Sequence, residues 1–362
     1  MKKATNSALM RVKNQKIILS LINKKPISRV DLAKKTGLTK AAVTIIIDEL
    51  KQKNIINEQS EKTNSIGRNP VLLTLNPSAV YMAAVNITRL DITVGITDLA
   101  GNIVAKDTFP ICNPEEAFQR IQQIFNRQIA ENKIDISKIH KLSVASPGPV
   151  DVEKGIILNP PNFKSWHNIP IASKLRELTG LEVLLGNVSS ANAMAEKYFG
   201  SAHNSDNFLV LQIDEGIGSG IFLNDTLFTG PCELGHISIK YDGIKCTCGN
   251  RGCLEKYASI PQILKNSGFK SWQEVVDNNS KIILEKQADY LSTAITSANN
   301  LFNFDKIVIN GELAYKPEKI TKLISEKLKH IKLSDKEVTV CAGMIKSKLK
   351  IAVSIAIHDF FN

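Results

Sequence analysis

The most specific part of the sequence is ELGH at residues 233–236 followed by CTCGNRGCLE at residues 246–255. One histidine and three closely spaced cysteines are the donor set of a closed tetrahedral zinc site. We therefore predict a structural Zn²⁺ with no open position for a catalytic water, bound by His236, Cys246, Cys248 and Cys253. The alternatives are reduced, unliganded cysteines or a redox pair.

The positive charge of the chain is concentrated in its first eighty residues. They hold 15 Lys and Arg against 5 Asp and Glu, whereas the other 282 residues hold 31 against 30. A basic head on a neutral body indicates that one part of the protein meets phosphates. From charge alone, a solvated lysine face on an ordinary helical cap is an equal alternative.

Length and composition narrow the class of protein. A chain of 362 residues with 43% hydrophobic content is long enough for two or three domains and is too apolar to be disordered. No apolar run reaches the length of a membrane span, and no hydrophobic segment follows the first lysines. We expect a cytoplasmic protein with no membrane partner.

The basic head has the pattern of a helix-turn-helix. Residues 14–21 begin a helix that ends by Pro26, Ser28 caps a second helix, and Thr39 caps a third after a turn at Gly37. In the third helix, Val43, Ile46, Ile47 and Leu50 recur at i, i+3, i+4 and i+7, which predicts one buried stripe. Residues 55–58 and 71–75 then predict two strands of a wing.

The other side of the third helix is expected to contact DNA. Small side chains let a helix enter the major groove, and methyl groups such as that of Ile45 can contact thymine. Arg68, between Gly67 and Pro70 in the wing turn, is suited to a narrow minor groove, although a surface turn arginine is the alternative. A protein-docking module is the alternative for the whole head. The predicted DNA-binding residues are Arg29, Thr39, Lys40, Ala41, Thr44 and Arg68.

The remaining residues alternate strand and helix patterns. Residues 80–105 predict two strands with a turn at 99–102, and residues 142–145 predict a buried strand. Further helices are predicted at 170–180 and 188–199, and further strands at 182–186, 208–213 and 220–223. This alternation is typical of α/β layers.

With its ELGH and CxCGxxGCxE runs, the chain resembles the ROK family of repressors, open reading frames and sugar kinases over about residues 14–361. The basic head resembles the repressor branch, and the head, wing and cysteine loop are similar to those of xylose-repressor-type regulators. The resemblance implies a two-lobed actin-like body, of the sugar kinase and ribonuclease H-like type, with a sugar cleft between the lobes.

The expected organisation is a winged helix-turn-helix domain over 1–80 and a ROK body over 81–362. Lobe one of the body would cover about 81–190 plus the C-terminal helix. Lobe two would cover about 191–345 and contain the zinc loop at 236–253.

Three departures from the family's kinases predict that this body has no catalytic residues. Residues 86–89 (NITR) replace the first phosphate loop, which resembles Asp-x-Gly-Gly in the kinases. Val188 replaces the aspartate that would act as general base. The second phosphate loop survives in part as DEGIGSG at 214–220, but Glu215 places a carboxylate where a triphosphate would lie.

The same resemblance implies a sugar effector bound by Asn162, Asn187, Glu233, His236 and Glu255, with one ring nitrogen of His236 on zinc and the other towards the sugar. Glu255 as a helix cap and Asn162 as a turn residue are the alternatives. Between Gly230 and Glu233 about four residues of the family's loop are missing, so the identity of the sugar stays open.

These features predict a DNA-binding transcriptional repressor of carbohydrate genes. It would be sugar-responsive, would form a homodimer or higher homo-oligomer, and would bind a roughly palindromic double-stranded operator. The alternatives are a ROK sugar kinase with an atypical phosphate site and a DNA-binding regulator that has lost its small-molecule effector.

Overall fold

The computed structural model of the protein describes residues 7–60, 71–331 and 337–362. The chain divides into two compact units. Unit one comprises Met1–Asn187 and Lys348–Asn362, and unit two comprises Val188–Ser347. The chain therefore passes between the units twice, after Asn187 and after Ser347. None of the helices among the described residues has the length and hydropathy that crossing a membrane requires.

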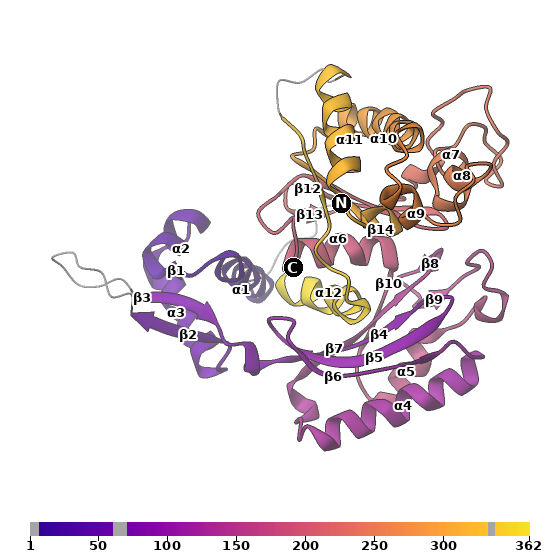
Figure 1. The fold of residues 1–362 in the computed structure, drawn as a ribbon. Helices are drawn as coiled ribbons and strands as arrows, with labels where there is room; N and C mark the ends of the chain where they lie inside the picture. Colours follow the sequence, from indigo (N-terminus) through magenta and orange to yellow (C-terminus); the bar gives the residue numbers. More distant parts are fainter. Residues whose placement is uncertain (1–6, 61–70, 332–336) are drawn as a thin grey trace. The chain divides into compact units, whose positions relative to one another are not determined.

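Unit one begins with a module of three helices and a small antiparallel sheet (Figure 1). The strand order in the sheet is β1-β3-β2, so the N-terminal strand pairs with the strand that closes the module. The elements are α1 (Ser7–Lys24), β1 (Ile27–Ser28), α2 (Arg29–Thr36), α3 (Lys40–Gln52), β2 (Ile56–Ser60) and β3 (Val71–Leu75).

Local side-chain chemistry sets the helix boundaries in this module. The Ser28 hydroxyl accepts a hydrogen bond from the Asp31 main-chain N–H at 3.1 Å and caps α2, and Thr39 caps α3 by accepting from Ala42 at 3.2 Å. Gly37 ends α2 in the left-handed region at φ +70°. The predicted stripe of α3 is buried, as Val43, Ile46, Ile47 and Leu50 are each at most 5% exposed.

The rest of unit one is a five-stranded sheet of order β10-β7-β4-β5-β6. Strands β4, β5 and β6 form an antiparallel meander, and β7 and β10 extend it in parallel. The elements are β4 (Tyr81–Ile87), β5 (Asp91–Asp98), β6 (Ile103–Pro110), α4 (Pro114–Glu131), β7 (Ile139–Ser146), β8 (Val150–Asp151), β9 (Ile156–Ile157), α5 (Ile171–Thr179), β10 (Val183–Asn187) and α12 (Lys348–Phe361).

Helices cover both faces of this sheet. The apolar residues of α4 and α5 pack on one face in a core that includes Val85 and Val144. Helix α12 lies on the other face against β4 and β7 (Figure 1). The C-terminal helix thus covers this sheet although residues 188–347 lie between them in sequence.

Unit two is built on a second five-stranded sheet, of order β13-β12-β11-β14-β15. Its elements are α6 (Val188–Phe199), β11 (Phe208–Ile213), β12 (Ile217–Leu223), β13 (Thr226–Leu227), α7 (Glu255–Ala258), α8 (Ile260–Leu264), α9 (Trp272–Asp277), α10 (Lys281–Phe302), β14 (Lys306–Gly311), α11 (Glu318–Ile331) and β15 (Thr339–Ala342).

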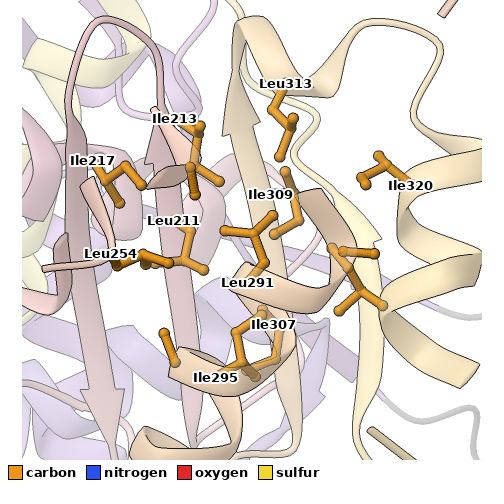
Figure 2. Packing of buried hydrophobic residues seen from close by; sticks show 14 of the residues in the cluster. Leu211, Ile213, Ile217, Leu254, Leu291, Ile295, Ile307, Ile309, Leu313 and Ile320 are labelled. Carbon is orange, nitrogen blue, oxygen red and sulfur yellow. The ribbon is translucent and has the colours of Figure 1, made fainter. Parts of the chain in front are cut away.

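The core of unit two lies between its sheet and the helices α10 and α11. Figure 2 shows Leu211, Ile307 and Ile309 of the strands packing against Leu291 and Ile295 of α10. Helix α6 contacts strands β11 and β12 of the same sheet. Leu234 and Leu254, which lie beside the ELGH and cysteine motifs, belong to this core, so both motifs are anchored in it.

The structure corrects one part of the sequence reading. Residues 81–110 form three strands where two were predicted, because a further turn follows Ile87. The turn is closed by Thr88, whose main-chain N–H donates to the Asp91 carbonyl at 2.9 Å and whose hydroxyl bonds the Asp91 carboxylate at 2.9 Å. It contains neither Gly nor Pro, which are the signals that mark turns in a sequence.

Candidate metal centre and binding residues

The four predicted metal ligands converge on one point. The ligand atoms of His236, Cys246, Cys248 and Cys253 all lie within 4.8 Å of one another. His236 Nδ1 is 3.6 Å from Cys246 Sγ, and Cys248 Sγ is 3.6 Å from Cys253 Sγ. Tetrahedral metal–sulfur and metal–nitrogen bonds of about 2.3 and 2.0 Å place their ligands about 3.5–3.8 Å apart. The donor set and its spacing therefore fit a metal ion.

A tight hairpin holds the three cysteines in place. The Cys246 N–H donates to the Asn250 carbonyl at 2.8 Å, and the Gly252 N–H donates to the Ile244 carbonyl at 2.9 Å. Gly252 has φ +70°, and a Cβ there would lie 1.7 Å from the Lys240 carbonyl oxygen. Only glycine fits this position, which explains why the motif needs Gly directly before Cys253.

The thiols of the cluster differ in acidity. Burial raises the pKa of Cys253 to about 12, and hydrogen bonds with its neighbouring thiols act in the same direction. For Cys246, burial opposes ionisation, but hydrogen bonds from the Cys248 main chain and from the neighbouring groups outweigh it and lower the pKa to about 7. A metal ion must therefore displace the proton of Cys253 when it binds.

Glu255 closes the cysteine motif and contacts a distant loop. It is the first residue of α7, and its Oε2 accepts a hydrogen bond from the Ile217 N–H at 3.0 Å. A Cβ on Gly216 would lie 2.8 Å from the same oxygen. The carboxylate thus sits against the 214–220 loop, whereas α7 has no capping hydrogen bond from its N-cap side chain.

Glu233 is exposed, and its main-chain carbonyl accepts from the His236 N–H at 2.9 Å. The short 230–233 segment before it is fastened to β12. The Ser219 hydroxyl donates to the Cys232 carbonyl at 2.7 Å and accepts from the Leu234 N–H at 3.3 Å. Sequence reasoning did not single out Ser219, whose hydroxyl holds the start of the ELGH motif on both sides of Glu233.

The two remaining predicted effector residues belong to unit one. Asn162 is exposed, has φ +56° and lies in the turn before Phe163, as its alternative role as a turn residue requires. Asn187 ends β10 opposite Ser146, and its amide packs on Gly148, where a Cβ would lie 2.2 Å from Asn187 Nδ2. The structure thus gives positions for all five predicted effector residues, two in unit one and three in unit two.

In the N-terminal module, the predicted DNA-binding residues of α3 lie opposite its buried stripe. Lys40 and Ala41 are exposed, Thr44 is half-buried, and Ile45 is 56% exposed. Thr39 caps the helix. The α3 face defined by Lys40, Ala41, Thr44 and Ile45 is therefore turned away from the core of the module, with Thr44 partly buried at its border.

Arg29 stands apart from that face. The Arg29 guanidinium bonds Asp48 Oδ1 and Glu58 Oε1, both at 2.9 Å, and so ties α2 to α3 and β2. Arg29 thus helps to position α3, and Glu58 is shared with Lys51, so a contact of Arg29 with DNA stays a prediction. Arg68 lies outside the described residues.

Comparison with known proteins identifies the family of the chain. The sequence profile of the ROK family matches residues 82–352. The chain belongs to the ROK family. The xylose repressor of Bacillus subtilis is 30% identical over 318 residues, which are 83% of this chain and 82% of that repressor. A glucokinase of Thermotoga maritima is 29% identical over 61% of this chain and 78% of its own length.

A solved structure resembles almost the whole chain. It is a ROK family transcriptional regulator described as a homologue of the E. coli Mlc protein, with 25% identity, a TM-score of 0.81 and coverage of 97% of each chain. The prediction that this chain is a ROK protein of the repressor branch is therefore confirmed.

The ROK body carries carboxylates around its second phosphate loop. Asp214 accepts hydrogen bonds from Gln212 and from the Glu312 N–H. The pKa of Glu312 is raised, first by burial and then by the negative charges of Asp214 and Glu215. These carboxylates, together with Glu255, make the loop region acidic.

Asn86 and Val188 stand at two further positions where the sequence departs from the kinases. Asn86, at the end of β4, is 1% exposed, and its amide atoms make no hydrogen bond within the described residues. Val188 is the first residue of α6. Neither side chain can serve as a general base towards a sugar hydroxyl.

Proposed function

We propose that this ROK protein is a sugar-responsive transcriptional repressor of carbohydrate genes. Its N-terminal module would act as a winged helix-turn-helix, with α3 as the recognition helix and the segment between β2 and β3 as the wing. The observation that carries this proposal is the face of α3 on which Lys40, Ala41 and Ile45 are exposed, in a module of strongly positive charge.

The body would sense a sugar and remain catalytically silent. Glu233 and Glu255 are the best candidate contacts in unit two, and Asn162 and Asn187 are the candidates in unit one. Zn²⁺ would be a structural ion on His236, Cys246, Cys248 and Cys253. Since His236 Nδ1 faces the cysteines, Nε2 is the nitrogen left to meet the sugar.

We further propose that the protein is cytoplasmic and acts as a homodimer or higher homo-oligomer on a roughly palindromic operator. A two-fold pair of recognition helices would contact half-sites about one helical turn, or a multiple of it, apart. Sugar binding would change the relative position of the two DNA-binding modules and so lower operator affinity.

The test begins with selection of binding sites from random-sequence DNA by the full-length protein. Lys40→Ala should weaken binding to the selected operator and reduce its salt dependence by about one counterion. Lys106→Ala, which removes the same charge from the exposed surface of β6, should have neither effect. Failure to select any DNA sequence would refute the repressor assignment.

Addition of xylose and other monosaccharides to the protein–operator complex tests the sugar response. Release of the operator by one sugar supports the proposal. Tight operator binding that no sugar alters would instead favour a regulator without a small-molecule effector.

A further inference from the structure

A surface depression in unit one contains Asn162 and has an unusual charge. Its polar lining is Arg89 from the turn between β4 and β5, together with Asn162, Lys164 and Ser165 from the segment before α5. Ile111 and Phe163 form its apolar part. All of these residues belong to the same unit, so the depression is complete within it.

The depression is held in shape by contacts below its surface. Arg89 Nε donates to the Pro161 carbonyl at 3.1 Å, which joins the β4–β5 turn to the 160–165 segment. The ring of Phe163 stacks on buried Trp166 at 5.6 Å and 6°. Trp166 Nε1 in turn donates to the Cys112 carbonyl at 3.1 Å. The lining residues are therefore fixed by an aromatic stack and two side-chain-to-main-chain hydrogen bonds.

The charge of the depression is uncompensated. It contains two cations and no carboxylate, and neither Arg89 nor Lys164 forms an ion pair with any residue that the structure describes. Asp91, two residues after Arg89, is occupied by Lys348 and by the Thr88 hydroxyl. Because Arg89 uses only Nε to reach Pro161, its two terminal nitrogens remain available as donors.

Donors of this kind select an anion. A guanidinium edge and a nearby ammonium match the oxygens of a phosphate or carboxylate, and such charge-assisted hydrogen bonds are stronger than neutral ones. The Asn162 amide and the Ser165 hydroxyl can bond hydroxyl groups of the same ligand. Arg89 also stands where a kinase of the family would have a glycine, so the side chain supplies a charge at a position where kinases use main-chain amides.

We propose that this depression binds the anionic group of a charged sugar, either a phosphate monoester or a sugar carboxylate. This inference rests on the proposed function, since it gives the chemical class of the effector. It assigns Arg89 and Lys164 to the anion and Asn162 and Ser165 to hydroxyl groups.

Calorimetry with the full-length protein tests the proposal with matched ligands. The probes are glucose, glucose 6-phosphate and glucuronate, then xylose and xylose 5-phosphate, with inorganic phosphate alone as the minimal anion. At least one charged sugar should bind ten-fold or more tightly than both its neutral parent and inorganic phosphate. The phosphate and carboxylate arms identify which anion is preferred.

Single substitutions test which residues cause the preference for a charged sugar over its neutral parent. Arg89→Ala and Lys164→Ala should each reduce it ten-fold or more, Arg89→Lys should keep part of it, and Lys106→Ala should leave it unchanged. Lys164 is an exposed residue, so its variant retains the fold even if loss of the Arg89–Pro161 bond loosens the depression.

Three results would overturn the proposal. They are equal affinity for neutral and charged sugars, a preference that survives in both alanine variants, or no binding by any probe at millimolar concentration. Weaker operator binding by Arg89→Ala in the absence of sugar would assign the depression to DNA phosphates instead. Operator binding by the unmodified protein is measured in the same buffer. If the unmodified protein did not bind the operator, the repressor function would fail, whatever the result at the anion site.

Discussion

The main-chain N–H of Ile217 donates a hydrogen bond to Glu255 Oε2 at 3.0 Å. Ile217 lies in the second phosphate loop, and Glu255 is the last residue of the cysteine motif. The bond therefore joins the cysteine motif to the loop that matches the nucleotide-binding loop of ROK kinases. The Ile217 amide is therefore already engaged within the protein.

We predict that the protein neither binds ATP nor phosphorylates sugars. Besides the occupied Ile217 amide, Asp214, Glu215 and Glu312 surround the loop with negative charge, and loss of a general base alone typically slows such a reaction about 10²–10⁴-fold. Calorimetry should detect no ATP binding at millimolar nucleotide, and Val188→Asp should not restore transfer of labelled phosphate to a hexose or pentose. Turnover above the rate without enzyme would contradict this prediction.

How well the sequence predicted the structure depended on the distance over which each interaction acts. The helix caps at Ser28 and Thr39 and the buried stripe of α3 follow from local chemistry, and the structure confirms them. The cluster of His236 and the three cysteines could also be predicted, because the cysteines lie within eight residues and their spacing is specific.

Contacts between residues far apart in the sequence could not be predicted in this way. Arg29 carries a charge suited to DNA, but its two carboxylate partners lie on α3 and β2, and only the fold brings them together. The Ser219 hydroxyl and the Glu255–Ile217 bond likewise depend on the packing of β12 against the cysteine loop. The turn between β4 and β5 is closed by the Thr88 side chain and contains no Gly or Pro, so the sequence carries no turn signal there.

We predict that removal of the metal destabilises unit two. Cys248→Ser removes one of four ligands, and loss of a structural metal is among the few changes that lower the free energy of unfolding by on the order of 4 kcal/mol or more. Denaturant unfolding should show a large loss for this variant and for protein treated with a chelator. Cys341→Ser, a cysteine outside the cluster, is the matched control and should show a small effect. Metal analysis should find about one zinc per chain, and its absence from protein purified without chelator would refute the site.

We predict that Ile45 reads thymine methyl groups in the operator. It is a large aliphatic side chain, 56% exposed on the face of α3 that carries Lys40 and Ala41. Burial of one methyl group is worth about 0.8 kcal/mol, so replacing a contacted thymine by uracil should weaken binding roughly four-fold.

In the Ile45→Ala protein, the thymine and uracil operators should bind with nearly equal affinity. Ile282→Ala, an exposed isoleucine on α10, should keep the four-fold difference of the unmodified protein. Equal affinities of the unmodified protein for the thymine and uracil operators would show that α3 recognises its site in another way.

The last prediction concerns Asp359, at the end of α12. Its carboxylate lies 2.8 Å from His140 Nε2 and 3.0 Å from Lys141 Nζ on β7, while Lys16 of α1 donates to its main-chain carbonyl at 3.0 Å. The bond with His140 contributes most to lowering the pKa of Asp359 to about 2, Lys141 adds to the effect, and burial opposes it. Because the pKa is lower in the folded state, the carboxylate stabilises the fold at pH values above about 4, and this contribution disappears as the pH falls through about 2.

Asp359→Asn should therefore lower the free energy of unfolding at pH 7. A shift of nearly two pKa units corresponds to about 2.5 kcal/mol, and we expect about 1–2 kcal/mol because the side chain is 31% exposed and partly screened. Urea unfolding between pH 7 and pH 3 should show the gap between the two proteins constant down to about pH 4 and narrowing below it. Glu182→Gln, which removes the other and more exposed partner of Lys141, should have a much smaller effect. A gap that widens as the pH falls would have the wrong sign and would show that Asp359 does not stabilise the fold through its charge.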